Sequence, residues 1–283
     1  MGSSCVTAFR RIVRRVERRR CPRRFAFALA MALAATGCST GAGGEAQHKN
    51  ARWDYVALGD SVPYGAGDVA GRSFVSIYAH FIEQDTGALV RVHNLATDGG
   101  TARDLLGQLR DDPEVRRALK GAEILTISIG GNDLESHLAD YASNRCGGAD
   151  NQMCFRAAVA AFEPTWAAVL AEVLRLREDK SIIRVTNDYN PFPGNLRAAA
   201  NLGKGITDVF THYLRQLNQK RCSRAGHVGI PCADVAKAFN GAKTNESAFA
   251  KGLIGTDEFS HPSAKGHRLI AQILRRLGYR PLD

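Results

Sequence analysis

Residues 55–67 read YVALGDSVPYGAG and give the first indication of the fold. The run Tyr55–Leu58 is continuously apolar, as expected for a strand of a parallel sheet that helices cover on both faces. Gly59 follows at once, and its missing Cβ lets the chain turn sharply. Asp60 and Ser61 then come directly after the predicted strand. The stretch therefore predicts a buried parallel strand with a serine at its carboxyl end.

The same pattern recurs along the chain. Four more strands are predicted, at Val90–Leu95, Glu123–Ile129, Ile182–Thr186 and Val228–Ala233. Helices are predicted around them, at Phe74–Gln84, Ala102–Leu109, Phe155–Arg177, Ile206–Lys220 and Ser263–Leu277. Strands that alternate with helices predict an α/β fold, here a doubly wound three-layer α/β/α sandwich with a mostly parallel five-stranded sheet of flavodoxin-like type. With no internal repeat, residues 51–283 are interpreted as one domain.

Small and polar residues follow the predicted strands, where sheets of this type place their active sites. These segments are GDS at 59–61, ATDGG at 96–100, GGND at 130–133 and NDYNP at 187–191. The hydroxyl of Ser61 is a candidate nucleophile, the side-chain amide of Asn132 is a candidate oxyanion donor, and Gly99 or Gly100 offers a bare backbone N–H. Each motif alone is explained equally well by a turn or a helix cap.

His261 is the candidate base. It precedes Pro262 and a predicted helix whose N-cap is Ser263, so its loop is expected to be fixed. Glu258 and Asp257 stand three and four residues earlier. A carboxylate that accepts one ring N–H leaves the other nitrogen free to take the serine proton.

Together these segments resemble the SGNH, or GDSL-like, hydrolases, a family that includes secreted bacterial lipases and esterases. The resemblance covers residues 53–280 and rests on four blocks in the family's order: YVALGDSVPYGAG, NLATDGGTA, SIGGNDL and DEFSHPSAKGH. It implies a serine hydrolase that cleaves carboxylic esters, with Ser61 as nucleophile and His261 as base. It also implies an oxyanion hole formed by the Ser61 and Gly99 amides and the Asn132 side chain. No cofactor or metal is expected.

Two positions depart from the family's pattern. Val62 stands where leucine is common, which is a modest change in an apolar position. Glu258 stands where the family usually has aspartate, so the third member of the triad is Glu258, Asp257 or a backbone carbonyl, and we favour Glu258. Tyr64, Tyr189 and Asn190 are candidates for lining the substrate cleft.

Two other functions are weighed against ester hydrolysis. Metallophosphoesterases also carry Gly-Asp and Gly-Asn at strand ends, but the Asp-x-His and the later His that they require are missing. The remaining histidines form no HxH or HExxH metal motif. The alternative is a non-catalytic lipoprotein that keeps the fold to bind lipid or glycan.

The formal net charge of +10 comes mostly from the N-terminus. Residues 1–37 hold nine arginines and one acid, so the rest of the chain carries only +2. We therefore expect no nucleic-acid partner. The arginines precede the apolar run FAFALAMALAA at 25–35, which is too short to cross a bilayer and is typical of a signal peptide. Whether export would follow the general or the twin-arginine route stays open.

A lipobox-like AATGC ends the signal at Cys38, although Ala35 stands where leucine is preferred. We interpret residues 1–37 as a signal peptide with lipobox, Cys38 as the lipidated N-terminus, and residues 38–50 as a flexible tether. The protein would lie on the outer face of the bacterial cell membrane or be secreted. We expect a monomer that acts on a lipid or envelope ester.

Four cysteines remain in the exported part. An even number in an exported chain predicts disulfides. We favour the local pairing Cys146–Cys154 and Cys222–Cys232, because each pair brackets a loop that contains glycine. A zinc site is disfavoured, since no Cys-x-x-Cys occurs.

Overall fold

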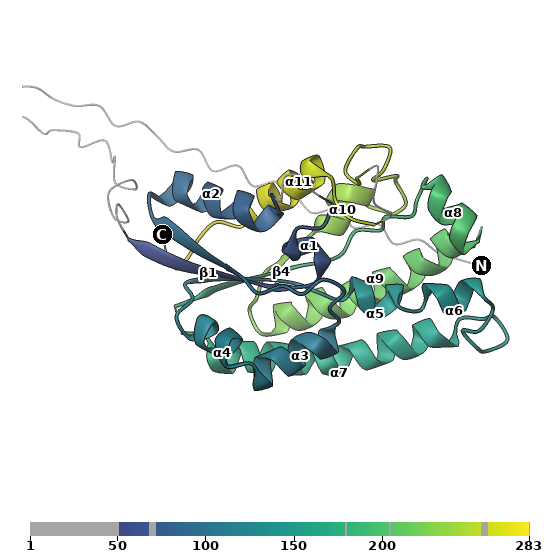
Figure 1. The fold of residues 1–283 in the computed structure, drawn as a ribbon, viewed down its shortest axis with the longest axis horizontal. Coiled ribbons are helices and arrows are strands. Elements are labelled where there is room, and N and C mark those ends of the chain that lie inside the picture. Colours follow the sequence, from purple (N-terminus) through teal and green to yellow (C-terminus); the bar gives the residue numbers. More distant parts are fainter. Residues whose placement is uncertain (1–50, 68–71, 179, 204, 256–259, 283) are drawn as a thin grey trace, which may run out of the picture. The chain divides into compact units, whose positions relative to one another are not determined.

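A central sheet of five parallel strands organises the molecule (Figure 1). The computed structural model describes residues 51–282 except 68–71, 179, 204 and 256–259. The strands are β1 (Arg52–Gly59), β2 (Leu89–Asn94), β3 (Ile124–Ser128), β4 (Ile182–Thr186) and β5 (Cys232–Ala233). Their order is β2-β1-β3-β4-β5 and every pairing is parallel. This flavodoxin-like order reverses between β1 and β3, which places the topological switch point there.

Helices cover both faces of the sheet (Figure 1). One face carries α2 (Phe74–Thr86), α10 (Val235–Asn240) and α11 (Ala264–Arg275). The other carries α3 (Ala102–Asp111), α4 (Pro113–Lys120), α7 (Met153–Leu176) and α9 (Ile206–His227). Shorter helices are α1 (Ser61–Tyr64), α5 (Gly131–Glu135), α6 (Leu138–Ala142) and α8 (Leu196–Leu202). The three-layer α/β/α sandwich predicted from the sequence is therefore confirmed.

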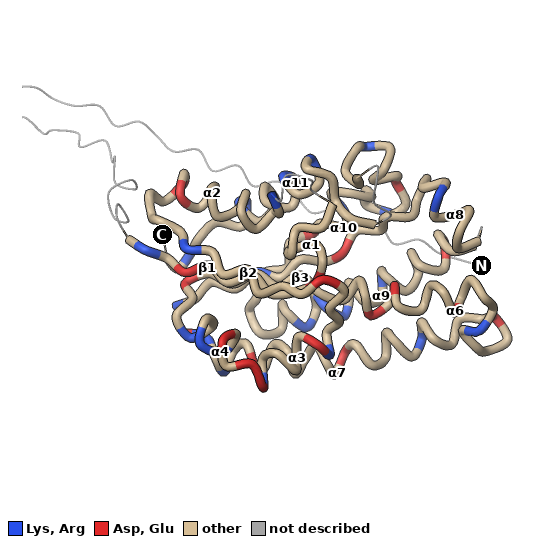
Figure 2. Tube along the Cα trace, viewed as in Figure 1, with Lys and Arg blue, Asp and Glu red and all other residues tan. Residues whose placement is uncertain are grey.

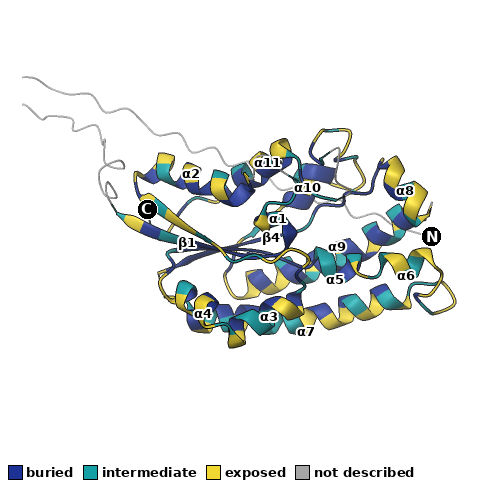
Figure 3. Ribbon diagram, viewed as in Figure 1, coloured by how far each residue is buried: buried dark blue, intermediate teal, exposed yellow. Residues whose placement is uncertain are grey.

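Strand β1 shows why the apolar runs are continuous. Tyr55 and Ala57 pack into the core below α2 and α11, whereas Val56 and Leu58 pack into the core on the side of α7. Successive side chains of a strand point to opposite faces, so a strand buried on both faces needs apolar residues at every position. Figure 3 shows the central strands and the inward sides of the helices as the buried part of the fold, whereas β2 at the edge of the sheet has no buried residue.

Helix α7 is the one described helix that could cross a membrane by length and composition alone. Phe162, Trp166 and Val173 nevertheless lie buried on its inward side, against the core that α3 and α9 share. A long apolar helix of this kind is also typical of the core of a folded domain. Lysines, arginines and acidic residues are spread over the helices of both layers (Figure 2).

The last strand is shorter than predicted. The sequence predicts a strand over Val228–Ala233, but only Cys232 and Ala233 pair with β4. Helix α9 continues to His227, and the chain then turns through Gly229, whose φ is +75°. The Ile230 N–H returns to the Ala225 carbonyl at 2.9 Å, so these apolar residues close a helix end instead of extending the sheet.

Both predicted disulfides are present. Cys146 and Cys154 are joined with their Cα atoms 5.0 Å apart, and Cys222 and Cys232 with theirs 5.3 Å apart. The first closes the loop before α7, and the second ties α9 to β5.

Candidate active site

The segment after β1 fixes the position of Ser61. Gly59 has φ +141°, and a Cβ there would lie 1.8 Å from the Ser128 carbonyl oxygen on β3, so only glycine fits. The Asp60 N–H donates to that same carbonyl at 3.1 Å. The Asp60 carboxylate then caps α1 by accepting the Val62 N–H at 3.1 Å. Ser61 is consequently held at the first position of α1, where its own N–H has no intrahelical acceptor.

The segment that carries His261 is fixed by a short antiparallel bridge between Ile254 and Pro262. The Gly255 N–H donates to the His261 carbonyl at 3.0 Å, and the Ser263 Oγ caps α11 by accepting the Gly266 N–H. The loop that carries the His261 imidazole, just before α11, is thus held by hydrogen bonds on both sides, as its sequence context predicts.

The two segments bring Ser61 and His261 together across 200 positions of sequence. The Nε2 atom of His261 lies 2.9 Å from the Ser61 Oγ. At this distance the hydroxyl can donate its proton to the ring nitrogen. The arrangement provides a nucleophile and a base in direct hydrogen-bond contact, which is the geometry that acyl transfer by a serine requires.

Asn132 and Asp133 link the end of β3 to the loop after β2. The Asn132 Nδ2 donates to the Gly100 carbonyl at 2.9 Å, and the Asp133 carboxylate accepts the Ala102 N–H at 3.0 Å. An amide nitrogen carries two hydrogens, so Asn132 keeps one for another acceptor. Sequence reasoning gave Asp133 no role, although it stands in the GGND motif.

Gly99 and Gly100 are distinguished by their hydrogen bonds. The Gly100 N–H donates to the Thr97 carbonyl at 3.0 Å. In the described part of the chain no acceptor is found for the Gly99 N–H, and Gly99 has φ +72° with open space around it. Gly99 is therefore the glycine whose amide is available, although it is not among the residues that line the cavity beside Ser61.

A small cavity of about 30 Å³ lies beside the Ser61–His261 pair. It is lined by residues from the segments that follow β1, β3 and β4, from α9 and from the loop before α11, namely Asp60, Ser61, Val62, Gly131, Asn132, Glu135, Asp188, Tyr189, Phe210, Leu214, Ser260 and His261. Tyr189, one of the candidates for the substrate cleft, is among these residues, and its hydroxyl donates to the Ser260 carbonyl at 2.6 Å.

The other two candidates for the cleft lie elsewhere. The side chain of Tyr64 is 60% exposed and does not line this cavity. Asn190 is buried away from it, where its Nδ2 donates to Thr211 and its Oδ1 accepts the Phe192 N–H. Its position is explained by the fold of the segment after β4.

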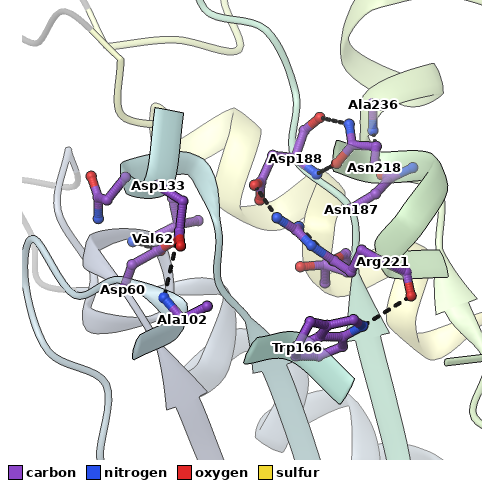
Figure 4. Close-up of polar contacts among 12 residues, drawn as sticks. Asp60, Val62, Ala102, Asp133, Trp166, Asn187, Asp188, Asn218, Arg221 and Ala236 are labelled. Carbon is purple, nitrogen blue, oxygen red and sulfur yellow. Dashed lines mark hydrogen bonds and ion pairs between the residues drawn. The ribbon is translucent and has the colours of Figure 1, made fainter. Parts of the chain in front are cut away.

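Behind the cavity, the fully buried guanidinium of Arg221 forms an ion pair with Asp188 (Figure 4). Arg221 also donates to the Thr186 carbonyl at 3.0 Å. Gly130 makes room for it, because a Cβ there would lie 2.2 Å from the Arg221 Nη2. The GGND motif at 130–133 therefore begins against a buried ion pair. No motif marks Arg221 in the sequence, and it was not predicted.

Two carboxyl groups at the site have raised pKa values. Burial and the neighbouring charge of Asp188 raise the pKa of Asp60 well above its usual range. Burial raises the pKa of Glu135 to about 7, and Asp188 adds to the shift while His261 opposes it. Glu135 follows Asn132 by one helical turn, and sequence reasoning did not single it out.

Some predicted positions lie outside the described residues. Glu258 and Asp257, the candidates for the third triad member, fall in 256–259, and Cys38 falls in 1–50. Within the described ranges, no group of three or more His, Cys, Asp or Glu side chains is arranged to hold a metal ion.

The sequence is similar to those of known lipases. Residues 57–269 match the sequence model of the GDSL-like Lipase/Acylhydrolase family. The chain is 26% identical to the spore germination lipase LipC of Bacillus licheniformis, over 81% of this chain and 98% of that protein.

Solved structures show the same fold. A lipase from a goat rumen metagenome, Lip_vut3, superimposes with a TM-score of 0.67 at 23% identity, covering 82% of this chain and all of that one. Phospholipase A1 from Streptomyces albidoflavus NA297 gives a TM-score of 0.59 at 19% identity, covering 79% and 98%. Because the family's sequence model matches about three quarters of the sequence, and Ser61, Asn132 and His261 line one cavity, the chain belongs to the GDSL-like lipase/acylhydrolase family.

Proposed function

We propose that the protein hydrolyses carboxylic esters through an acyl-enzyme on Ser61. His261 takes the Ser61 proton as the hydroxyl attacks the ester carbonyl carbon. The Ser61 and Gly99 amides and the Asn132 side chain donate to the oxygen that becomes negative. His261 then passes its proton to the leaving alcohol. In the second half, His261 takes a proton from water as the water attacks the acyl-enzyme, and it passes this proton to the Ser61 Oγ as the acid is released.

The observation that carries this proposal is the 2.9 Å contact between the Ser61 Oγ and the His261 Nε2. The two residues come from opposite ends of the domain, and a purely structural hydrogen bond would not need to face a cavity. Asn132 lines the same cavity, which supports its proposed role. Membership in the lipase and acylhydrolase family supports an ester as the substrate.

Labelling with a fluorophosphonate tests the nucleophile directly. Wild-type protein should be labelled on Ser61, and Ser61→Ala and His261→Ala should lose labelling while remaining folded. The hydrolysis of p-nitrophenyl esters from acetate to palmitate should fall by at least about 10⁴-fold in Ser61→Ala. Folded wild-type protein that is neither labelled nor active would favour the alternative, a non-catalytic lipid- or glycan-binding lipoprotein. Activity that EDTA abolishes would point to metal-dependent chemistry instead.

Glu258 is proposed as the group that orients His261, with Asp257 or a backbone carbonyl as the alternatives. Glu258→Gln and Asp257→Asn separate them. The variant that removes the true partner should lower kcat strongly, because the wrong imidazole tautomer becomes populated. Equal, small effects of both would leave a backbone carbonyl as the partner.

The protein is further proposed to be exported and held at the outer face of the cell membrane by lipid on Cys38. The support is the arginine-rich start, the short apolar run and the AATGC segment. Both disulfides of the folded domain fit an oxidising compartment. Membrane attachment favours a lipid or envelope ester as substrate, and the protein is proposed to act as a monomer.

A further inference from the structure

His267 is a buried histidine that the proposed mechanism does not use. It lies on α11, six residues after His261, and its side chain has no solvent exposure. Both ring nitrogens have partners, and both partners belong to the segment that follows the nucleophile. The Nδ1 faces the Phe74 N–H at 3.2 Å, and the Nε2 faces the Ala66 carbonyl at 3.0 Å.

These partners determine which nitrogen carries the proton. A backbone N–H can only donate, so the Nδ1 that faces Phe74 must be unprotonated. A carbonyl oxygen can only accept, so the Nε2 that faces Ala66 must carry hydrogen. His267 is therefore assigned as the neutral Nε2–H tautomer, from its hydrogen-bond network.

On one side the ring replaces a missing helix cap. Phe74 is the first residue of α2, and its N–H is one of those that a helix cannot satisfy internally. The N-cap residue Ser73 makes no side-chain capping bond. The Nδ1 of His267 supplies the acceptor, which ties the start of α2 to α11.

On the other side the ring is linked to the nucleophile through one residue. The Ala66 N–H donates to the Ser61 carbonyl at 3.0 Å, while the Ala66 carbonyl accepts from His267. The next residue, Gly67, packs against the base: a Cβ there would lie 2.7 Å from the His261 Cβ and 2.5 Å from the Pro262 carbonyl oxygen. The nucleophile segment and the base segment are therefore in direct contact where His267 holds them.

We propose that His267 is a positioning residue, which bridges Ala66 and Phe74 through its two ring nitrogens and so holds Ser61 in register with the His261 imidazole. The proposal rests on the proposed ester hydrolysis, and it assigns His267 no contact with substrate. Displacements of about 1 Å between reacting groups cost on the order of 100-fold in rate, so a support of this kind should affect kcat more than KM.

Three substitutions separate the two hydrogen bonds. In His267→Asn the side-chain oxygen takes the place of Nδ1 and keeps the bond to Phe74. In His267→Gln the amide nitrogen takes the place of Nε2 and keeps the bond to Ala66. His267→Phe keeps the ring volume and loses both bonds. Ile270→Val on the same helix is buried in the same core and serves as the control for stability. His80→Asn, at an exposed site on α2, is the control for replacing a histidine.

Kinetics on a p-nitrophenyl ester should then show a graded loss. His267→Phe should lower kcat about 100-fold with KM within about threefold. The kcat of His267→Gln should be about tenfold higher than that of His267→Phe. The kcat of His267→Asn should rise less, because only the bond to Ala66 connects His267 to Ser61. Ile270→Val and His80→Asn should keep kcat within about twofold. A folded His267→Phe that keeps wild-type kcat overturns the proposal, and so does an equal loss in Ile270→Val at matched thermal stability.

Two readouts do not depend on turnover. Long-range ¹H–¹⁵N NMR of histidine-labelled protein should show the Nε2–H tautomer for His267, assigned by the signal missing in His267→Asn. Exchange of the Phe74 amide hydrogen should be faster in His267→Gln and His267→Phe than in His267→Asn. The opposite tautomer, or a Phe74 exchange rate that none of the variants changes, overturns the bridge. If wild-type protein shows neither labelling nor turnover, ester hydrolysis fails, while these two readouts still decide whether the bridge exists.

Discussion

Asn132 combines two tasks at the scale of a single residue. One amide hydrogen is used to hold the Gly100 carbonyl, and the other is available to the oxyanion in the proposed mechanism. The bond to Gly100 orients the amide before substrate arrives, so no reorganisation is needed when charge develops. A preoriented donor in a site that excludes water stabilises the transition state more than the same donor does in solution.

Replacing Asn132 by Ala should therefore lower kcat by about 10²–10³-fold, which is about 3–4 kcal/mol of transition-state stabilisation, and leave KM nearly unchanged. Steady-state kinetics on p-nitrophenyl acetate measures both constants. Asn144→Gly is a suitable control, since Asn144 is exposed and has φ +58°, which glycine adopts without strain. A rise in KM at constant kcat would contradict the role, because it would indicate uniform binding rather than an oxyanion contact.

Glu135 makes stability depend on pH. Its pKa is raised from the ordinary value of 4.5 to about 7 in the folded protein, because burial disfavours the charged form. The folded state thus binds more protons than the unfolded state between these values, and stability must fall as pH rises from about 4.5 to 7 and level off above. The shift corresponds to a loss of up to about 3 kcal/mol.

Glu135→Gln should remove this loss, because the amide stays neutral. The variant should gain stability over wild type by about 1–3 kcal/mol at pH 8 and by much less at pH 5. Urea denaturation at the two pH values measures the difference. Glu178→Gln, at an exposed position, provides the comparison. A gain of the same size at both pH values would mean that ionisation of Glu135 is not its cause.

The residues of the site that lie in sequence motifs could be predicted. Residues that reach the site only because the chain folds there could not. Ser61, Asn132 and His261 follow strands or precede a helix in recognisable blocks, so their convergence follows from the parallel sheet. Arg221 follows Leu217 by four residues in α9, so helical spacing places it on the buried face, but no motif indicates which group its charge would pair with. Its burial depends on Gly130 and Asp188 lying opposite, which is a property of three-dimensional packing.

At the scale of elements, the central strands were predictable and the short helices were not. Strand β4 matches its predicted bounds, because four of its five residues, IIRVT, are β-branched and favour a strand. Helix α5 has five residues, two of which are Gly131 and Asn132, and such a stretch has no helical period to detect. The predicted strand at Val228–Ala233 is mostly wrong for the opposite reason. Its apolar residues have the pattern of a strand, but they form the turn around Gly229 that ends α9.

The contact between the loop after α1 and the loop before α11 is the element-level feature on which the site depends. Gly67 has φ +89°, and a side chain there would strike the backbone of the base segment. Gly67→Ala should lower kcat at least about tenfold, because the His261 loop must move away from Ser61. Fluorophosphonate labelling rates, measured with kcat, report the loss.

Gly203 provides a close match for this experiment. Its φ is +90°, close to that of Gly67, but nothing lies within 4 Å of the position of a Cβ, so Gly203→Ala adds backbone strain at a positive φ without the collision. That variant should lose stability and keep kcat. Equal kcat in the two variants would show that the close approach at Gly67 does not position the base.

At the scale of the whole molecule, the charge is divided between two regions with different tasks. Residues 1–37 account for a net +8, whereas the rest of the chain carries +2. A nearly neutral domain gains little from anionic lipid headgroups, where each basic residue near the surface contributes about 1 kcal/mol. In the proposed mature form, which lacks residues 1–37, attachment to the membrane would therefore rest on the proposed lipid at Cys38. Stable anchoring of this kind takes two lipid chains or more.

Cys38→Ala should accordingly move the protein from the membrane fraction to the soluble fraction and abolish the incorporation of labelled fatty acid. The turnover number on a soluble ester should stay within about twofold, because the family's pattern begins at residue 57, beyond the proposed tether. Cys21→Ala is the matched control, since Cys21 precedes the proposed cleavage site and its loss should change neither location nor labelling. Fractionation of the expressing cells measures all three forms side by side. A Cys38→Ala protein that stays in the membrane fraction would show that an uncleaved apolar segment, and not a lipid, holds the domain there.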